Sequence, residues 1–84
     1  MDAEDEARIR MRIEKDIAMF EKNISAIDRS CKYKKIIDLS EMYASDSRSY
    51  LKKCDYYTSF SCISYAHGLL DAIVLILEVE DNVH

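Results

Sequence analysis

The sequence predicts an all-α protein, an antiparallel up-and-down bundle of three helices. Three observations support this: the 84 residues include no Pro and one Gly, apolar residues recur at steps of three or four, and short polar breaks separate three such stripes. Pro and Gly punctuate hairpins and irregular loops, so their scarcity favours long helices. A chain that is 49% hydrophobic and 33% charged is typical of one folded domain, here residues 1–84. Because a single core barely suffices at this size, we expect a partner or a second copy.

The first helix is predicted over residues 4–29. Acidic residues crowd its beginning and Arg29 lies near its end, the order that the helix dipole favours. Its apolar stripe has the helical period and consists of Ile9, Ile13, Ile17, Phe20, Ile24 and Ile27.

The second and third helices are predicted over residues 33–53 and 56–79, with Asp55 as the N-cap of the third. The second stripe carries small Ser and Ala residues that allow close helix approach. Its members are Tyr33, Ile36, Ile37, Ser40, Tyr43, Ala44, Ser47, Tyr50 and Leu51. The third stripe consists of Phe60, Ile63, His67, Leu70, Val74 and Leu77. Short disordered ends are expected at about 1–3 and 80–84.

Charge and cysteine usage set expectations about partners and compartment. The net charge of -4 argues against binding to nucleic acid or an anionic membrane. Three cysteines without a CxxC pair, behind an acidic start, predict reduced thiols in a cytoplasmic protein. The apolar run from Leu69 to Leu77 is much shorter than the roughly 20 residues of a membrane span, so none is expected.

The stretch Ser64–Ala72 places a His, the only Gly and a carboxylate inside the most apolar segment. A hairpin of the second and third helices sets His67 level with Tyr43 and Phe20, and Asp71 follows His67 by one helical turn. Buried polar groups need hydrogen-bond partners. We therefore expect a polar lock that fixes helix register. The candidate polar site is Tyr43, Asp46, His67 and Asp71.

Two other interpretations of this stretch stay open. Ser64, His67 and Asp71 could be read as nucleophile, base and acid, but three parallel side chains of one helix offer no separate oxyanion site. We therefore assign no catalytic residue and do not expect an enzyme. A small-ligand or metal site, or an enzyme, could instead be built around His67, Asp71 and Tyr43. Cys31 and Cys54 lie at opposite ends of the second helix and cannot share an ion, so neither a metal ligand set nor a cofactor is assigned.

The segment from Leu69 to Val79 is apolar almost all the way around, more than one bundle face can cover. Such a surface usually marks a contact with another chain. The interface candidates are Leu69, Ile73 and Ile76. Gly68 and Ala72 would allow a backbone to approach closely, within the bundle or across a dimer. We expect a protein-interaction module that binds a second copy or an unidentified protein partner.

Several runs of this sequence resemble the archaeal family catalogued as domain of unknown function 357. They are Tyr43-Ala44-Ser45-Asp46-Ser47, Lys53-Cys54-Asp55-Tyr56-Tyr57, Phe60, and Tyr65-Ala66-His67-Gly68-Leu69-Leu70-Asp71-Ala72. The resemblance covers roughly residues 9 to 77. It implies a small three-helix bundle from an archaeal cytoplasm and no established activity. Cys54 stands where the family's turn would have Gly, and a left-handed conformation there would cost Cys more than Gly.

Overall fold

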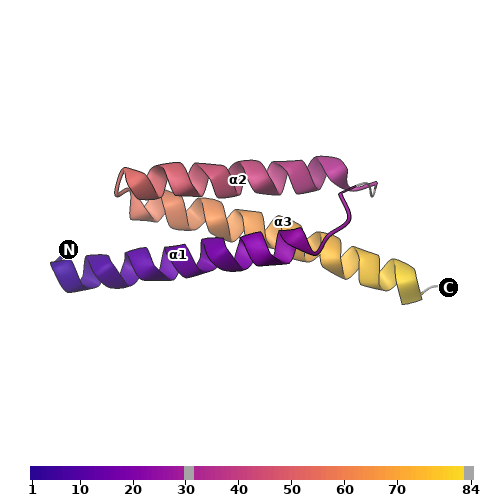
Figure 1. The fold of residues 1–84 in the computed structure, drawn as a ribbon, viewed down its shortest axis with the longest axis horizontal. Coiled ribbons are helices and arrows are strands. Elements are labelled where there is room, and N and C mark those ends of the chain that lie inside the picture. The colour runs from indigo at the N-terminus through magenta and orange to yellow at the C-terminus, as the bar shows by residue number, and fades with distance from the viewer. Residues whose placement is uncertain (30–31, 83–84) are drawn as a thin grey trace.

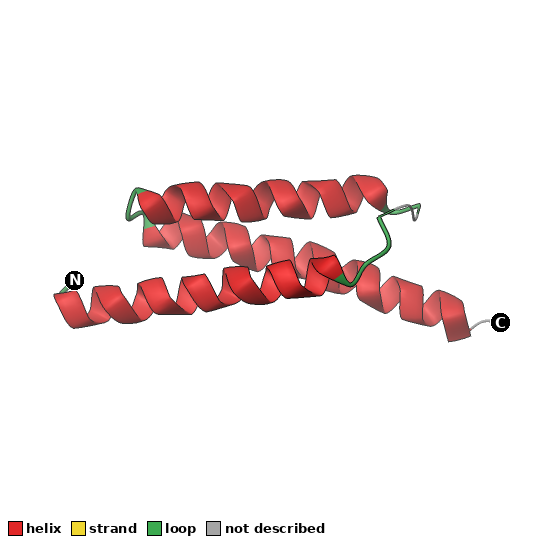
Figure 2. Cartoon of the chain, viewed as in Figure 1, coloured by secondary structure: helices red, strands yellow, loops and turns green. Residues whose placement is uncertain are grey.

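The computed structural model describes residues 1–29 and 32–82, and this part of the chain forms three helices. They are α1 (Ala3–Ser25), α2 (Lys34–Lys52) and α3 (Tyr56–Asn82), and α2 runs antiparallel to both others (Figures 1 and 2). The predicted all-α three-helix bundle is confirmed. The molecule measures 54 × 19 × 16 Å, because α1 and α3 each extend past the others at opposite ends (Figure 1).

The helix boundaries differ from the predicted ones by more than one residue at two places. α1 ends at Ser25 instead of residue 29, because the amides of Ala26 and Ile27 bond to carbonyls only three residues back and tighten the last turn. α3 continues to Asn82, so residues 80–82 are helical and not part of a disordered end. The carboxylate of Glu80 there accepts hydrogen bonds from Tyr33 and Lys32, which tie α3 to the start of α2. Residues 30–31, in the predicted turn, and 83–84 lie outside the described residues.

The core is a single cluster to which all three helices contribute. Its buried apolar members are Ile13, Ile17, Phe20, Ile24, Ile37, Ala44, Leu51, Ile63, Ala66, Leu70 and Ile73. α2 packs most closely on α3, while α1 contacts α3 more than it contacts α2. The fold is therefore a tight α2–α3 hairpin with α1 laid along one of its sides.

The turn between α2 and α3 has the hydrogen bonds of a Schellman motif. The amide of Cys54 donates to the carbonyl of Leu51 and that of Asp55 to the carbonyl of Tyr50, both at 3.0 Å. Cys54 has φ 61°, the left-handed conformation that favours Gly at this position. Asp55 then caps α3 by accepting from the amide of Thr58 at 3.1 Å, as predicted.

Candidate functional site

The His67 ring lies against α1. Its Nε2 is 2.7 Å from the backbone oxygen of Asp16, and its ring meets the Phe20 ring edge-on with centroids 5.7 Å apart. The predicted layer shared by His67 and Phe20 is therefore confirmed. Because a carbonyl oxygen can only accept, Nε2 carries the proton and donates. His67 thus locks α3 to the backbone of α1.

The other three residues of the candidate polar site lie elsewhere. Tyr43, on α2, packs on the Tyr65 ring with centroids 4.5 Å apart. Asp46, also on α2, lies near the Cys62 thiol, whose pKa is raised by burial and by the negative charges of Asp46 and Asp55.

Asp71 is exposed and lines a groove of about 610 Å³ between α3 and the end of α1. The prediction that His67 pairs with Asp71 and Tyr43 is therefore wrong. The reason is that a backbone carbonyl on α1 takes the imidazole hydrogen bond.

The hydrogen bond of His67 differs from that of the histidine in a catalytic triad. In a triad, the imidazole presents one nitrogen to the nucleophile and the other to a carboxylate. Here Nε2 of His67 donates to the backbone oxygen of Asp16 in α1, and not to a carboxylate or a nucleophile. Within the described residues, no group of three or more His, Cys, Asp or Glu side chains is arranged to hold a metal ion.

A polar cluster of a different kind joins α1 to the start of α3. Tyr56 donates to the carboxylate of Glu6, and Arg10 donates to the Tyr56 hydroxyl at 3.1 Å and to the Cys54 sulfur at 3.3 Å. The hydrogen bond to Glu6 is the main reason why the pKa of Tyr56 is raised to about 12. This cluster fixes the α2–α3 turn against α1.

Two predictions about packing are corrected. Gly68 and Ala72 are exposed, and a Cβ atom added at Gly68 would meet nothing within 4 Å, so they are not close-packing positions inside the bundle. Ile73 is fully buried and cannot serve as an interface residue, because its side chain is in the core. Leu69 is half-buried, and Ile76 remains 41% exposed.

The structure brings together a surface that the sequence analysis only partly identified. Turned away from the core, α3 exposes eight uncharged residues at helical spacing, here named the outer face of α3. They are Ser61, Ser64, Tyr65, Gly68, Ala72, Leu75, Ile76 and Val79. Leu75 and Val79 are 61% and 62% exposed and were not among the interface candidates. Their three-to-four spacing from Gly68 and Ala72 is the signal that could have found them.

The outer face belongs to a helix with little charge. Among residues 56–77 the only Asp, Glu, Lys or Arg is Asp71. Within the described residues, α3 is the one helix long and apolar enough by length and composition to cross a membrane. Its most apolar 18-residue window has a mean hydropathy of 1.8, and only 22% of that window is buried.

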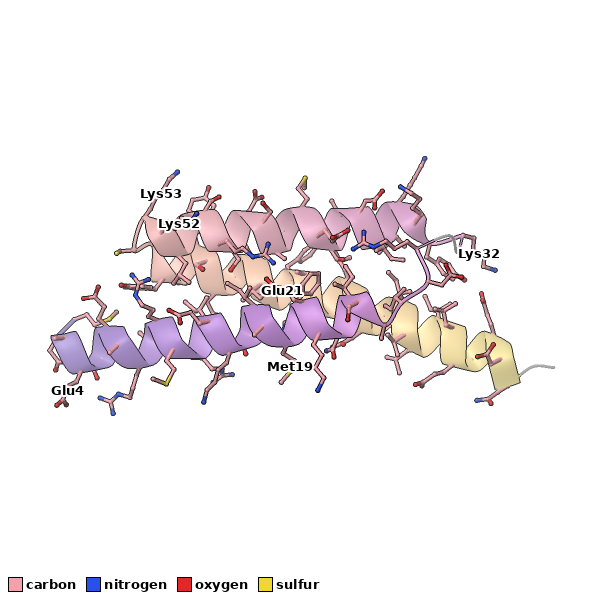
Figure 3. All side chains as sticks on the ribbon, in the orientation of Figure 1. Glu4, Met19, Glu21, Lys32, Lys52 and Lys53 are labelled. Atoms are coloured by element: carbon pink, nitrogen blue, oxygen red, sulfur yellow. The ribbon has the colours of Figure 1, made fainter. Side chains whose placement is uncertain are left out.

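Charged groups stand at both ends of the α2–α3 hairpin. Lys52 and Lys53 lie at the end that holds the turn, as Figure 3 shows. Glu78 and Asp81 lie in the last turns of α3, at the other end, where Lys32, Lys34 and Lys35 also lie at the start of α2. Along α3 itself, the uncharged outer face ends at an acidic last turn.

Comparison with known proteins places the chain in a family. No curated protein matches it. A family model described as a protein of unknown function (DUF357) matches residues 15–77, from the middle of α1 to Leu77 in α3. Since this match covers most of the sequence, including the Ser64–Ala72 stretch, the chain belongs to the DUF357 family.

Proposed function

We propose that this protein is a self-associating interaction module, and that the outer face of α3 docks on a second copy of the chain. The observation that carries the proposal is the exposure of this uncharged face. On α1 and α2 the exposed positions include many Lys, Arg, Asp and Glu, whereas the outer face has none of them. A helix that is apolar around its whole circumference is normally buried on every side. α1 and α2 bury two sides of α3 and leave the outer face exposed.

The chain exposes more surface than a compact monomer of its mass. It exposes 5896 Å², whereas a compact monomer of 9.8 kDa exposes about 5,200 Å². The excess, about 700 Å², follows from the elongated shape, 54 Å in its longest dimension. It is close to the roughly 800 Å² that each partner buries in a standard interface, so pairing would bring the exposed area toward that of a compact protein.

Charge favours a second copy over a bilayer as the cover of this face. A spanning α3 would take the charged residues of the closely packed α2 into the hydrocarbon, where they are costly. A helix lying in the interface binds anionic lipid through Lys and Arg. α3 has neither residue, ends in Glu78, Glu80 and Asp81, and belongs to a chain of net charge -4.

The test is to place a charge on the outer face. We expect the native chain to form a dimer in sedimentation equilibrium. Leu75→Glu should weaken that dimer at least about a hundredfold, because two-fold symmetry buries the new carboxylate twice. Met19→Glu is the matched control, since Met19 is 58% exposed and points away from α2 and α3 (Figure 3).

Three results would overturn the proposal. One is a native chain that is folded and monomeric at every accessible concentration. Another is equal weakening by Leu75→Glu and Met19→Glu. The third is a monomer that floats with phosphatidylcholine vesicles and loses this binding on Leu75→Glu, which would make the outer face a membrane surface instead.

A further inference from the structure

We infer that the two copies pair with their α3 helices antiparallel, about a two-fold axis that passes near residue 70. This inference rests on the proposed self-association and adds the orientation of the partner. A two-fold dimer buries the same patch on both subunits, so the patch must be complementary to itself. The outer face meets that condition better when the two α3 helices run antiparallel than when they run parallel.

The first argument is the size of the side chains along the outer face. Its first half carries the small residues Ser61, Ser64 and Gly68 and one aromatic residue, Tyr65, and its second half carries Leu75, Ile76 and Val79. An antiparallel pair centred near residue 70 sets Val79 against Ser61 of the second copy, Ile76 against Ser64 and Leu75 against Tyr65. A parallel pair would set large against large at one end and leave a gap at the other. Close packing favours the antiparallel pair.

The second argument is the centre of the face. Gly68 and Ala72 flank the proposed axis, and the space where a Gly68 side chain would stand is open to 4 Å. In the antiparallel pair each Gly68 faces Ala72 of the second copy. Two helix backbones can approach most closely where both side chains are small. The crossing point of the two α3 helices therefore coincides with their smallest residues.

The third argument is the charge of α3 itself. Parallel pairing would place the Glu78 and Asp81 carboxylates of the two α3 helices together, which opposes association. Antiparallel pairing separates these carboxylates and brings them to the first turns of α3 of the second copy, which follow Lys52 and Lys53.

Cysteine cross-linking tests the orientation in a chain whose native cysteines are replaced by Ser and that still dimerises. In one chain Ser61→Cys is introduced, and in another Val79→Cys. Along α3 the two positions are about 27 Å apart, and a disulfide needs Cα atoms about 5.5 Å apart. We expect mixing the two chains under mild oxidation to give the mixed disulfide dimer, and each chain alone to stay uncross-linked.

A charge exchange in the native chain gives an independent measurement. Lys52→Glu with Lys53→Glu should weaken the dimer by at least about fivefold, and so should Glu78→Lys with Asp81→Lys. Combining all four should restore it, because the ends are again complementary. Cross-linking of each single-cysteine chain with itself, or no restoration by the fourfold exchange, would overturn the antiparallel arrangement. If the chain still self-associates and Leu75→Glu abolishes that association, the proposed function holds and only the antiparallel orientation is wrong.

Discussion

The imidazole of His67 is held by two contacts from one helix, the Asp16 carbonyl and the edge of the Phe20 ring. Helical spacing predicted the layer shared with Phe20 correctly. It did not predict the hydrogen-bond partner, because every residue has a carbonyl and only the register between α1 and α3 decides which one is reached. The spacing between His67 and Asp71 suggested a pair, yet the ring turns toward α1 and leaves Asp71 at the surface.

We predict that His67 and Asp71 differ in their contribution to stability. His67→Ala should lower the free energy of unfolding by about 1–2 kcal/mol, because it removes a partly buried hydrogen bond and the contact with Phe20. Asp71→Ala should change it by less than about 0.5 kcal/mol, as exposed substitutions do. Urea unfolding followed by circular dichroism measures both. Equal losses of unfolding free energy in the two variants would instead support the predicted pairing of His67 with Asp71.

The contact between α2 and α3 is built from small side chains. The seam of α2 was predicted correctly except at Ile36, which is 37% exposed; its small residues Ser40, Ala44 and Ser47 are all buried. The stripe of α3 was predicted only in part. Ile63 and Leu70 are buried, but Phe60 and Val74 are 42% and 38% exposed, and Ser59, Ala66 and Ile73 are also fully buried. Because α3 is apolar around its circumference, periodicity could not tell the side that faces α2 from the side that faces α1.

Ser47 and Ser59 form a reciprocal pair across this seam. Each hydroxyl is 2.8 Å from the backbone oxygen of the other residue, and the two hydroxyl oxygens are 3.1 Å apart. Both residues are fully buried. The pair therefore satisfies its own hydroxyls without water and lets the two helices approach closely.

We predict that the two serines are energetically coupled. Ser47→Ala and Ser59→Ala should each cost about 1–2 kcal/mol of unfolding free energy, because each removes a buried hydrogen bond and leaves one hydroxyl with fewer partners. The double variant should cost less than the sum by at least about 0.5 kcal/mol. Urea unfolding of the four chains completes the cycle, with the exposed Ser45→Ala as control. Strict additivity would show that the hydroxyls act independently.

At the scale of the whole molecule, α1 is the helix held least firmly. It contacts α2 sparsely, and a groove of about 360 Å³ lies between them, lined by apolar Ile17, Ala18 and Leu51 and by charged residues. Two ion pairs span this side, Arg48 with Glu21 and Arg29 with Glu41. Elements with few buried contacts open before the rest of a protein. The α2–α3 hairpin, which also presents the outer face, is therefore the stable unit, with α1 attached along its other side.

The Arg29–Glu41 pair predicts how this attachment depends on pH. The hydrogen bond from Arg29 lowers the pKa of Glu41, so the folded protein favours the carboxylate more than the unfolded chain does. Its contribution to stability is present above the ordinary pKa of Glu and is lost as pH falls through the lowered value. Wild type should therefore be more stable than Glu41→Gln at pH 7, and the difference should shrink as the pH falls below the ordinary pKa of Glu.

Urea unfolding at pH 7 and at a series of acidic pH values measures this difference, and Glu14→Gln, which removes an exposed α1 carboxylate, is the control. A difference between wild type and Glu41→Gln that stays constant with pH would mean that Glu41 contributes by packing and not by charge. Because the pair is largely exposed, 1 M salt should reduce the difference at pH 7 as acid does. If the difference is lost both in acid and in 1 M salt, the charge of the Arg29–Glu41 pair holds the end of α1 on α2.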